Sequence, residues 1–296
     1  MRAISIFNQK GGVGKTTTVV NLAVGLKSQG SKVLVLDMDP QSNTTTGLGF
    51  DKYNVGASIY DLFYEKGMVG DLVDKKEESL EKDDKDQELL TKEGQERKIE
   101  EKSIDFSKYI KEGKSGVGLI PSESSLSGLE VELVSLDPLD RVRLLKKIVE
   151  GLKDQMDYDY LLIDCPPSLG LLSVNALVAS DSIIIPIQTE YYALEGVSEL
   201  MNTYSLVKES LNKDLEIEGV LLTMFDKKNK LSYEVVEEVK AYFKEKVFKV
   251  MIPRNVKLAE APSYGKSILE YEAKSKGARA YRILASELME AKTDGK

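Results

Sequence analysis

The residues best suited to chemistry stand together near the start of the chain, at positions 8–17, which read Asn-Gln-Lys-Gly-Gly-Val-Gly-Lys-Thr-Thr. Three glycines in this stretch permit backbone φ angles above zero, so that successive N–H groups can approach an anion. Lys15 is placed to reach the β- and γ-phosphates of a nucleotide, and the Thr16 hydroxyl to hold Mg²⁺. The stretch therefore predicts a phosphate-binding loop.

The segments on either side of this loop agree with that prediction. Residues 3–7 form an apolar run typical of a buried strand, and residues 17–26 carry apolar side chains at helical spacing. Strand, glycine-rich turn and helix is the context that a phosphate-binding loop requires. The amino end of such a helix faces the phosphates with its partial positive charge.

Carboxylates follow two further apolar runs. Residues 32–37 end in Asp37, with Asp39 two positions later, and residues 158–164 end in Asp164. In open α/β sheets ligands bind at the carboxyl ends of the strands. Asp37 and Asp39 suit Mg²⁺ binding and the positioning of water, and a strand that ends in aspartate is the Walker B arrangement, in which Asp164 binds the water shell of Mg²⁺.

The rest of the sequence alternates strands with helices. We expect strands at residues 117–121, 182–187, 218–226 and 246–252, helices at residues 59–63, 124–134, 138–156, 229–244 and 277–291, and a loop at residues 44–49. Roughly seven or eight parallel-type strands separated by helices favour one architecture. That architecture is an α/β fold, doubly wound, with a mostly parallel sheet and helices on both faces.

One segment departs from this pattern. Residues 71–114 hold 15 acidic and 11 basic residues and few apolar ones, so they cannot bury enough surface to form a core. We expect a charged insertion at about residues 70–114, a solvated helix or an excursion on the surface of a single domain that spans residues 1–296. A partner-binding role for the insertion stays open.

Composition excludes several classes of protein. A net charge of −8 argues against a constitutively basic nucleic-acid-binding protein, and the absence of histidine excludes imidazole general-base chemistry. The one cysteine, Cys165, forbids an internal disulfide and agrees with a reducing cytosol. We read it as a small buried thiol. The chain enters its first strand at once, so we expect no signal peptide and a cytoplasmic location.

The phosphate-binding loop differs from the ordinary motif G-x-x-x-x-G-K-[ST] at two points. Gln9 stands where the ordinary motif has its first glycine, and an additional lysine, Lys10, opens the loop. The run K-G-G-V-G-K-T resembles the deviant Walker A loop of the ParA, MinD and nitrogenase-iron-protein class of ATPases. The nitrogenase-type branch is excluded, because its iron–sulfur cluster needs several cysteine thiolates.

Three other stretches, residues 37–41, 190–196 and 252–265, resemble the ParA/Soj family of chromosome- and plasmid-partition ATPases. The likeness covers nearly the whole chain outside the charged insertion. It implies an ATP-dependent sandwich homodimer that binds double-stranded DNA without sequence preference and associates with the nucleoid in its ATP state. It also implies a ParB-like, centromere-binding partner that stimulates slow, Mg²⁺-dependent hydrolysis of ATP.

The resemblance also implies roles for single residues. Lys10 would reach the γ-phosphate of the other subunit, Thr17 the α-phosphate, and Asp39 would orient the attacking water, while Asp37 and Asp164 would support the metal beside Thr16. The catalytic candidates are thus Lys10, Lys15 and Asp39. Nucleotide contacts would come from Lys10, Gly11, Gly12, Val13, Gly14, Lys15, Thr16 and Thr17, and adenine would lie against Thr223, Met224, Pro253, Arg254 and Asn255.

A basic stretch near the carboxyl terminus predicts the DNA-binding face. Residues 227–282 hold 14 lysines and arginines against 7 acidic residues, in a protein that is acidic overall. An ordinary solvated basic surface is the alternative explanation. The candidate phosphate contacts are Lys227, Lys228, Arg254, Lys257, Lys276 and Arg279.

Two other functions stay open. A MinD-type regulator would need a membrane-binding amphipathic helix, whereas the helix expected at residues 277–291 carries a stripe that we expect to face the core, formed by Tyr281, Ile283, Leu284, Leu288 and Met289. We therefore expect no stable membrane anchor. A metabolic P-loop enzyme, such as a ligase, would need an additional small-molecule pocket and would make a product besides ADP and phosphate.

Overall fold

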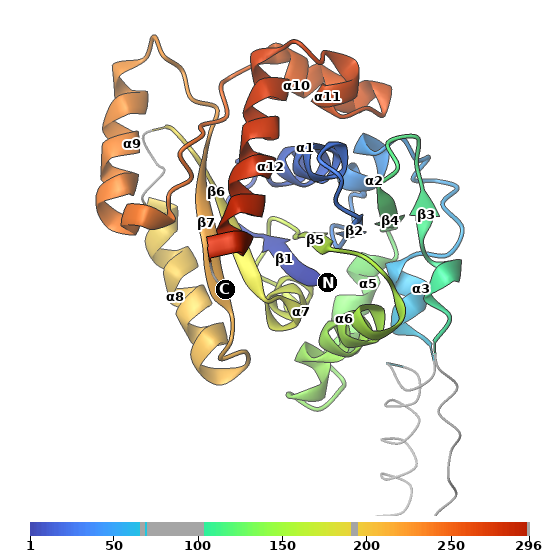
Figure 1. Ribbon diagram of the computed structural model, residues 1–296. Helices are drawn as coiled ribbons and strands as arrows, with labels where there is room; N and C mark the ends of the chain where they lie inside the picture. Colours follow the sequence, from blue (N-terminus) through green and yellow to red (C-terminus); the bar gives the residue numbers. More distant parts are fainter. Residues whose placement is uncertain (66–68, 70–103, 191–194, 295–296) are drawn as a thin grey trace, which may run out of the picture.

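The central element of the protein is a twisted β-sheet between two layers of helices (Figure 1). The computed structural model describes residues 1–65, 69, 104–190 and 195–294. Within these residues the sheet has seven strands in the order β3-β4-β2-β5-β1-β6-β7. Their bounds are β1 Arg2–Ile6, β2 Val33–Asp37, β3 Lys111–Glu112, β4 Gly118–Ile120, β5 Tyr160–Asp164, β6 Ser182–Gln188 and β7 Glu216–Thr223.

Every strand pair is parallel except β3–β4. The central strands are buried on both faces, and alternate residues of each strand serve the two cores: Leu34 and Leu36 of β2 point to one, Val33 and Val35 to the other. Such continuous apolar strands are typical of parallel sheets that are covered on both sides. The predicted doubly wound, mostly parallel α/β fold is confirmed.

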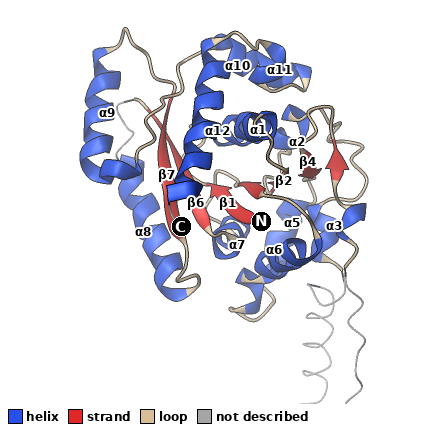
Figure 2. Cartoon of the chain, in the orientation of Figure 1, coloured by secondary structure: helices blue, strands red, loops and turns tan. Residues whose placement is uncertain are grey.

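Helices cover both faces of the sheet (Figures 1 and 2). One layer contains α1, α2, α10, α11 and α12, and the other contains α3, α5, α6 and α7, with α8 and α9 beside β6 and β7. Their bounds are α1 Lys15–Ser28, α2 Asn43–Gly47, α3 Ile59–Phe63, α5 Leu126–Leu133, α6 Leu144–Gln155, α7 Leu171–Ala179, α8 Glu195–Ser210, α9 Lys230–Phe243, α10 Val256–Glu260, α11 Ile268–Tyr271 and α12 Lys276–Asp294.

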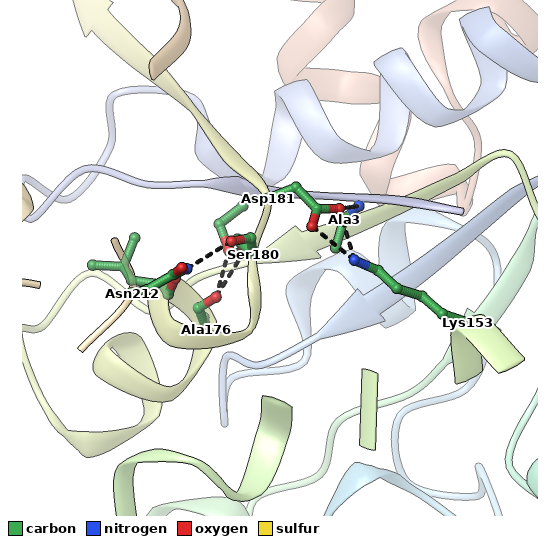
Figure 3. Close-up of polar contacts among 8 residues, drawn as sticks. Ala3, Lys153, Ala176, Ser180, Asp181 and Asn212 are labelled. Carbon is green, nitrogen blue, oxygen red and sulfur yellow. Dashed lines mark hydrogen bonds and ion pairs between the residues drawn. The ribbon is translucent and has the colours of Figure 1, made fainter. Parts of the chain in front are cut away.

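At the amino ends of the strands, hydrogen bonds join polar groups from several segments of the chain (Figure 3). The Asp181 carboxylate accepts the N–H of Ala3 at 2.7 Å and two bonds from the Lys153 ammonium, at 2.7 and 2.9 Å. The Asn212 amide donates to the carbonyl of Ser180 at 2.8 Å. These bonds join β1, α6, the α7–β6 turn and the segment before β7 to one another.

The prediction of a loop at residues 44–49 is wrong, because residues 43–47 form helix α2. Threonine side chains usually disfavour helices by bonding to the nearby backbone. Here the hydroxyl of Thr44 donates to Asp164 and that of Thr45 to Asp37, both at 2.7 Å. Because distant carboxylates take these hydroxyls, the backbone is left to form a helical turn.

The single helix expected at residues 138–156 is divided in two. A 3₁₀ turn covers Asp140–Val142, and α6 begins only at Leu144, after Arg143 with φ −111° and ψ −2°. The N–H of Leu145, in the first turn of α6, donates to the side chain of Asn175 on α7 at 3.2 Å. A partner on another helix thus replaces the carbonyl that a continuous helix would offer.

The prediction of a last strand at residues 246–252 is also wrong. A 3₁₀ turn covers Lys244–Lys246, and the segment beyond it makes only isolated parallel bridges, Val220 with Val247 and Phe225 with Pro253. The N–H groups of residues 249 and 250 donate instead to the Glu287 carboxylate of α12, at 2.8 and 2.9 Å. A side chain therefore takes the donors that a sheet ladder needs.

The carboxyl end of the predicted charged insertion is folded, which corrects that boundary. Phe106 and Tyr109 are 2% and 6% exposed and belong to the core beneath α6, and β3 joins the edge of the sheet. The Phe106 ring packs closely against Gly151 of α6. These aromatic residues anchor the segment, whereas residues 70–103 lie outside the described part of the chain.

The last expected helix is α12, and most of its predicted apolar stripe faces the core of the domain. Tyr281, Leu284 and Leu288 are buried there, and Met289 packs against the same core. Ile283 is the exception, because 42% of it is exposed. In the part of the chain that the structure describes, no helix is both long enough and apolar enough to cross a bilayer.

Candidate functional site

The phosphate-binding loop connects the carboxyl end of β1 to the amino end of α1. Gly12 and Gly14 have φ angles of 74° and 94°, which residues with a Cβ atom rarely adopt. A Cβ atom at Gly12 would meet nothing within 4 Å, so backbone conformation alone requires glycine there. Gly14 is the N-cap of α1 and offers no side-chain acceptor, which leaves the first N–H groups of the helix directed at the space in front of it.

Lys15 lies at the base of this space. It is only 7% exposed, and its ammonium donates to the carbonyl of Lys10 at 3.1 Å. Burial lowers the pKa of Lys15, against the opposing effect of the nearby Asp164 and Asp39 carboxylates. A desolvated ammonium of this kind interacts strongly with an anion that enters the site.

Asp37 and Asp164 end neighbouring strands at the same level of the sheet, and both are fully buried. One oxygen of Asp164 accepts the hydroxyls of Thr16 and Thr44, at 2.8 and 2.7 Å, whereas its Oδ1 has no hydrogen-bond partner. A buried carboxylate oxygen without a partner is costly in a folded protein. The unpartnered oxygen belongs to the same carboxylate that accepts the Thr16 hydroxyl, so it lies close to the residue predicted to hold Mg²⁺.

The two carboxyls also have perturbed ionisation. Burial and the neighbouring Asp164 raise the pKa of Asp37 to about 8, against hydrogen bonds from Thr45 that favour the ionised form. Burial raises the pKa of Asp164 to about 6. Two carboxylates this close disfavour simultaneous ionisation unless a positive charge enters between them or beside them.

Asp39 occupies a more open position than Asp37 and Asp164. It is 8% exposed, and its Oδ1 accepts the N–H of Gln41 at 2.9 Å, while its own N–H donates to Asp37 at 3.2 Å. These bonds fix the turn between β2 and α2 and direct Asp39 to the cavity in front of the loop.

Two adjoining cavities lie at the carboxyl end of the sheet. The first, of about 350 Å³, is lined by Gly11, Gly12, Gly14, Lys15, Thr16, Thr17, Asp39, Gln41, Asn43, Pro167 and Met224. The second, of about 330 Å³, is more apolar and is lined by Gly14, Thr17, Thr223, Met224, Ile252, Pro253, Arg254, Asn255, Val256, Leu258, Ala259 and Tyr281. Gly14, Thr17 and Met224 line both cavities, so the two cavities adjoin.

Most of the predicted nucleotide contacts therefore meet around these two cavities. Lys10 and Val13 do not line them: they border a small separate hollow together with Asn8, Ile187, Gln188 and Gly196. Asp37 and Asp164 are absent from the lining as well, because both are fully buried.

Sequence reasoning missed several residues around the two cavities. Gln41, Asn43 and Pro167 border the first cavity, and Tyr281 closes the second. Thr44 and Thr45 hold the two buried carboxylates. The run of threonines that begins at Thr44 could have indicated this role from sequence, since hydroxyls near an acidic strand end suit contacts to carboxylates and metals. Met224 also has a left-handed φ of 53°, the kind of local strain found at functional sites.

The predicted DNA contacts lie on adjoining segments. Lys227 and Lys228 precede α9, Arg254 and Lys257 lie before and within α10, and Lys276 and Arg279 begin α12; all six are exposed. The Phe225–Pro253 bridge and the packing of Gly277 against Leu258 hold the three segments together. Two of the cations have partners within the chain, since Arg254 pairs with Glu190 at 2.6 Å and Lys257 with Glu260 at 2.8 Å.

Comparison with known proteins points to one family. The model of a family described as an AAA domain matches residues 1–217. The chain is 46% identical to the sporulation initiation inhibitor protein Soj of Bacillus subtilis, covering 97% of this chain and 98% of that protein. It is 45% identical to the chromosome partitioning protein ParA of Myxococcus xanthus, covering 99% and 89%.

Solved structures share the fold. One is described as cobyrinic acid a,c-diamide synthase of Mycobacterium smegmatis with bound ADP and magnesium; it is 30% identical, with a TM-score of 0.75 over 100% of this chain and 97% of that chain. Another, a cell division ATPase MinD of Pyrococcus furiosus, has a TM-score of 0.69 over 98% and 99% and is 23% identical, which supports the fold alone. Because its identity to Soj and ParA extends over nearly the whole length of both chains, the protein belongs to the ParA/Soj family of chromosome-partitioning ATPases.

Proposed function

We propose that this chain is a DNA-partition switch: with ATP it forms a homodimer that binds DNA without sequence preference, and hydrolysis releases it. The observation that carries the proposal is the pair of adjoining cavities at the carboxyl end of the sheet. One is lined by an anion-binding loop with Lys15 and Asp39, and the other has the apolar walls that a nucleobase requires. Together they match the two ends of a nucleotide.

The residues present also fit Mg²⁺. Among the described residues no group of three or more carboxylate, thiol or imidazole side chains is arranged as a metal site, so the protein would supply few direct ligands. That is usual for Mg²⁺, which keeps several waters and takes phosphate oxygens. The Thr16 hydroxyl would bind the ion, and the unpartnered Oδ1 of Asp164 would accept a water of its shell. When bound, the ion would neutralise charge on the phosphates.

Hydrolysis needs alignment of water and neutralisation of charge rather than a covalent step. Asp39, held by the Gln41 N–H beside the phosphate cavity, would orient the attacking water. Lys15 would hold the β- and γ-phosphates. Lys10 would act on the nucleotide of the partner subunit, which agrees with its exclusion from the cavity of its own chain.

The DNA-binding role rests on the six exposed cations on the adjoining segments before α9, around α10 and at the start of α12. Sequence-independent binding to duplex DNA depends on contacts to phosphates, which lysine and arginine provide. A ParB-like protein would stimulate hydrolysis and so end the DNA-bound state. The protein would then act in the cytoplasm, on the nucleoid while ATP is bound.

Two specific alternatives remain testable. A MinD-type membrane regulator would bind liposomes with ATP, although α12 exposes little apolar surface besides Ile283 in its described part. A metabolic synthase is suggested by the name of one solved structure, which is 30% identical to this chain. Identity to Soj is higher, at 46%, and a synthase would convert a further substrate besides making ADP and phosphate.

Fluorescence anisotropy of a random-sequence DNA duplex tests the proposal. The protein is titrated in Mg²⁺ with ATP, with ADP and without nucleotide, with salt raised from about 50 to about 200 mM. We expect binding only with ATP, falling steeply with salt. An absence of binding in every state would contradict the DNA-binding role, and liposomes would become the next partner to test.

A further inference from the structure

The two residues before Lys10 have side chains that contact distant parts of the fold. Asn8 is 7% exposed. Its Oδ1 accepts the N–H of Lys10 at 2.9 Å, and its Nδ2 donates to the carbonyl of Pro186 in β6 at 2.8 Å. One side chain therefore fixes the main chain of Lys10 relative to the neighbouring strand.

Gln9 makes the second contact. Its Nε2 donates to the Thr203 hydroxyl on α8 at 2.7 Å, and that hydroxyl donates in turn to the carbonyl of Glu199 at 3.2 Å. Thr203 is 8% exposed and Gln9 is half-buried, so the contact is partly shielded from water. The ordinary phosphate-binding motif has glycine at the position of Gln9 and has no side chain there to reach a helix.

The carbonyl of Lys10 is held as well, since it accepts the Lys15 ammonium at 3.1 Å. The main chain of Lys10 is thus bonded on both sides. No hydrogen bond or ion pair of the Lys10 ammonium occurs within the described part of the chain, so its main chain is fixed while its charged end remains available.

We propose that Asn8, Gln9 and Thr203 are positioning residues for ATP hydrolysis, because they hold the main chain of Lys10 against β6 and α8 and so place its ammonium for the nucleotide of the partner subunit. The inference rests on the proposed action of Lys10 on the partner's nucleotide. None of the three positioning residues lines either nucleotide cavity. Their loss is therefore expected to slow turnover and leave the affinity for nucleotide unchanged.

Thr203 offers a matched pair of variants on a helix outside the nucleotide cavities. Thr203→Val keeps the shape of the side chain and removes the hydroxyl, whereas Thr203→Ser keeps the hydroxyl. We expect Thr203→Val to lower kcat about five-fold, as the loss of one partly buried hydrogen bond implies, with the Kd of a fluorescent ATP analogue unchanged. Thr203→Ser should restore kcat. Asn8→Ala should behave like Thr203→Val, with a larger effect.

The same variants in a Lys10→Ala background separate positioning from general structural damage. If Thr203 acts through Lys10, Thr203→Val has no further effect there, on kcat or on the Kd of the dimer formed with a non-hydrolysable ATP analogue. An equal loss in both backgrounds, or full activity of Thr203→Val, overturns the inference. Normal turnover by Lys10→Ala alone would instead refute the proposed role of Lys10.

Discussion

The carboxylates at the two ends of the sheet differ in burial and in bonding: the Asp181 side chain is 44% exposed, whereas Asp37 and Asp164 are fully buried. At the amino end, both oxygens of Asp181 have partners, Lys153 and the N–H of Ala3 (Figure 3). At the carboxyl end, Asp164 keeps one oxygen without a partner, and burial beside Asp164 raises the pKa of Asp37 to about 8. Satisfied polar groups stabilise a fold, whereas buried groups left incomplete indicate a site that a ligand completes.

The backbone beside the cavities is strained, although strain is not confined to this end of the sheet, since Lys244 at the end of α9 also has a left-handed φ of 51°. At the carboxyl end, Ser42 and Met224 adopt left-handed φ angles of 56° and 53° although neither is glycine, and both lie in turns beside the cavities. Such conformations cost about 1–3 kcal/mol each and persist where the surrounding structure enforces them. Besides this strain, the carboxyl end has a buried carboxylate oxygen without a hydrogen-bond partner, whereas both oxygens of Asp181 have partners.

The largest expected effect is on the affinity for ATP, which should depend on a lysine at the carboxyl end of the sheet and not on one at the amino end. Lys15→Ala should weaken ATP binding by about 100-fold or more, because it removes a desolvated cation that faces the phosphates. Lys153→Ala, which removes a cation from the amino end, should leave ATP affinity unchanged. Calorimetric titration with a non-hydrolysable ATP analogue measures both. Similar losses in the two variants would show that the ends do not differ in this way.

The second prediction concerns stability at the amino end. Asp181→Ala leaves the buried N–H of Ala3 without an acceptor and should lower the free energy of unfolding by about 2 kcal/mol. Asp181→Asn retains an acceptor for that N–H and loses only the half-exposed ion pair with Lys153, for a cost of about 0.5 kcal/mol. Urea unfolding measures the two values. If Asp181→Asn is as unstable as Asp181→Ala, the ion pair contributes more than the Ala3 bond.

The third prediction uses the pH dependence of the carboxyl end without metal or nucleotide. Because the pKa of Asp37 rises from 3.8 to about 8 on folding, the native state binds more protons than the unfolded state between these values. Stability should therefore fall as pH rises through that window, by at most about 1.4 kcal/mol per pH unit for one group. Asp37→Asn cannot ionise and should lose this contribution.

Urea unfolding in EDTA at about pH 5, 6.5 and 8, which span the window in which Asp37 is expected to titrate, tests this prediction. The quantity to compare is the difference in the free energy of unfolding between Asp37→Asn and the parent. Asp37→Asn should gain stability relative to the parent as pH rises. Asp164, whose pKa burial raises to about 6, adds a slope of the same sign in both proteins below that value. A constant difference across the three pH values would show that Asp37 is already ionised in the metal-free protein.

Much of the carboxyl end was predictable from sequence because its signals are local. Glycines, Lys15 and Thr16 stand in one stretch, and Asp37 and Asp164 each end an apolar run. What escaped prediction depends on long-range partners. Gln9 bonds to Thr203, and Glu287 takes the N–H groups of residues 249 and 250 that a strand would have used. Spacing within a segment carries no signal of a partner so far along the chain.

The smallest expected effect compares two exposed ion pairs of equal length. Lys257–Glu260 on α10 and Lys208–Glu216 near the amino end of β7 are both 2.8 Å long. If Lys257 binds DNA phosphate, Glu260 competes for it, because the lysine must leave its carboxylate partner first. Glu260→Gln should then raise DNA affinity about two- to three-fold and steepen the salt dependence by up to about one unit of slope.

Glu216→Gln provides the matched control, since it makes the same change of net charge at the opposite end of the sheet. Anisotropy titrations with ATP and Mg²⁺ at several salt concentrations measure both variants against the parent. An equal rise in both variants would assign the effect to net charge and not to Lys257. A rise confined to Glu260→Gln would locate the DNA contact at α10, because only there does removal of the carboxylate release a lysine within reach of phosphate.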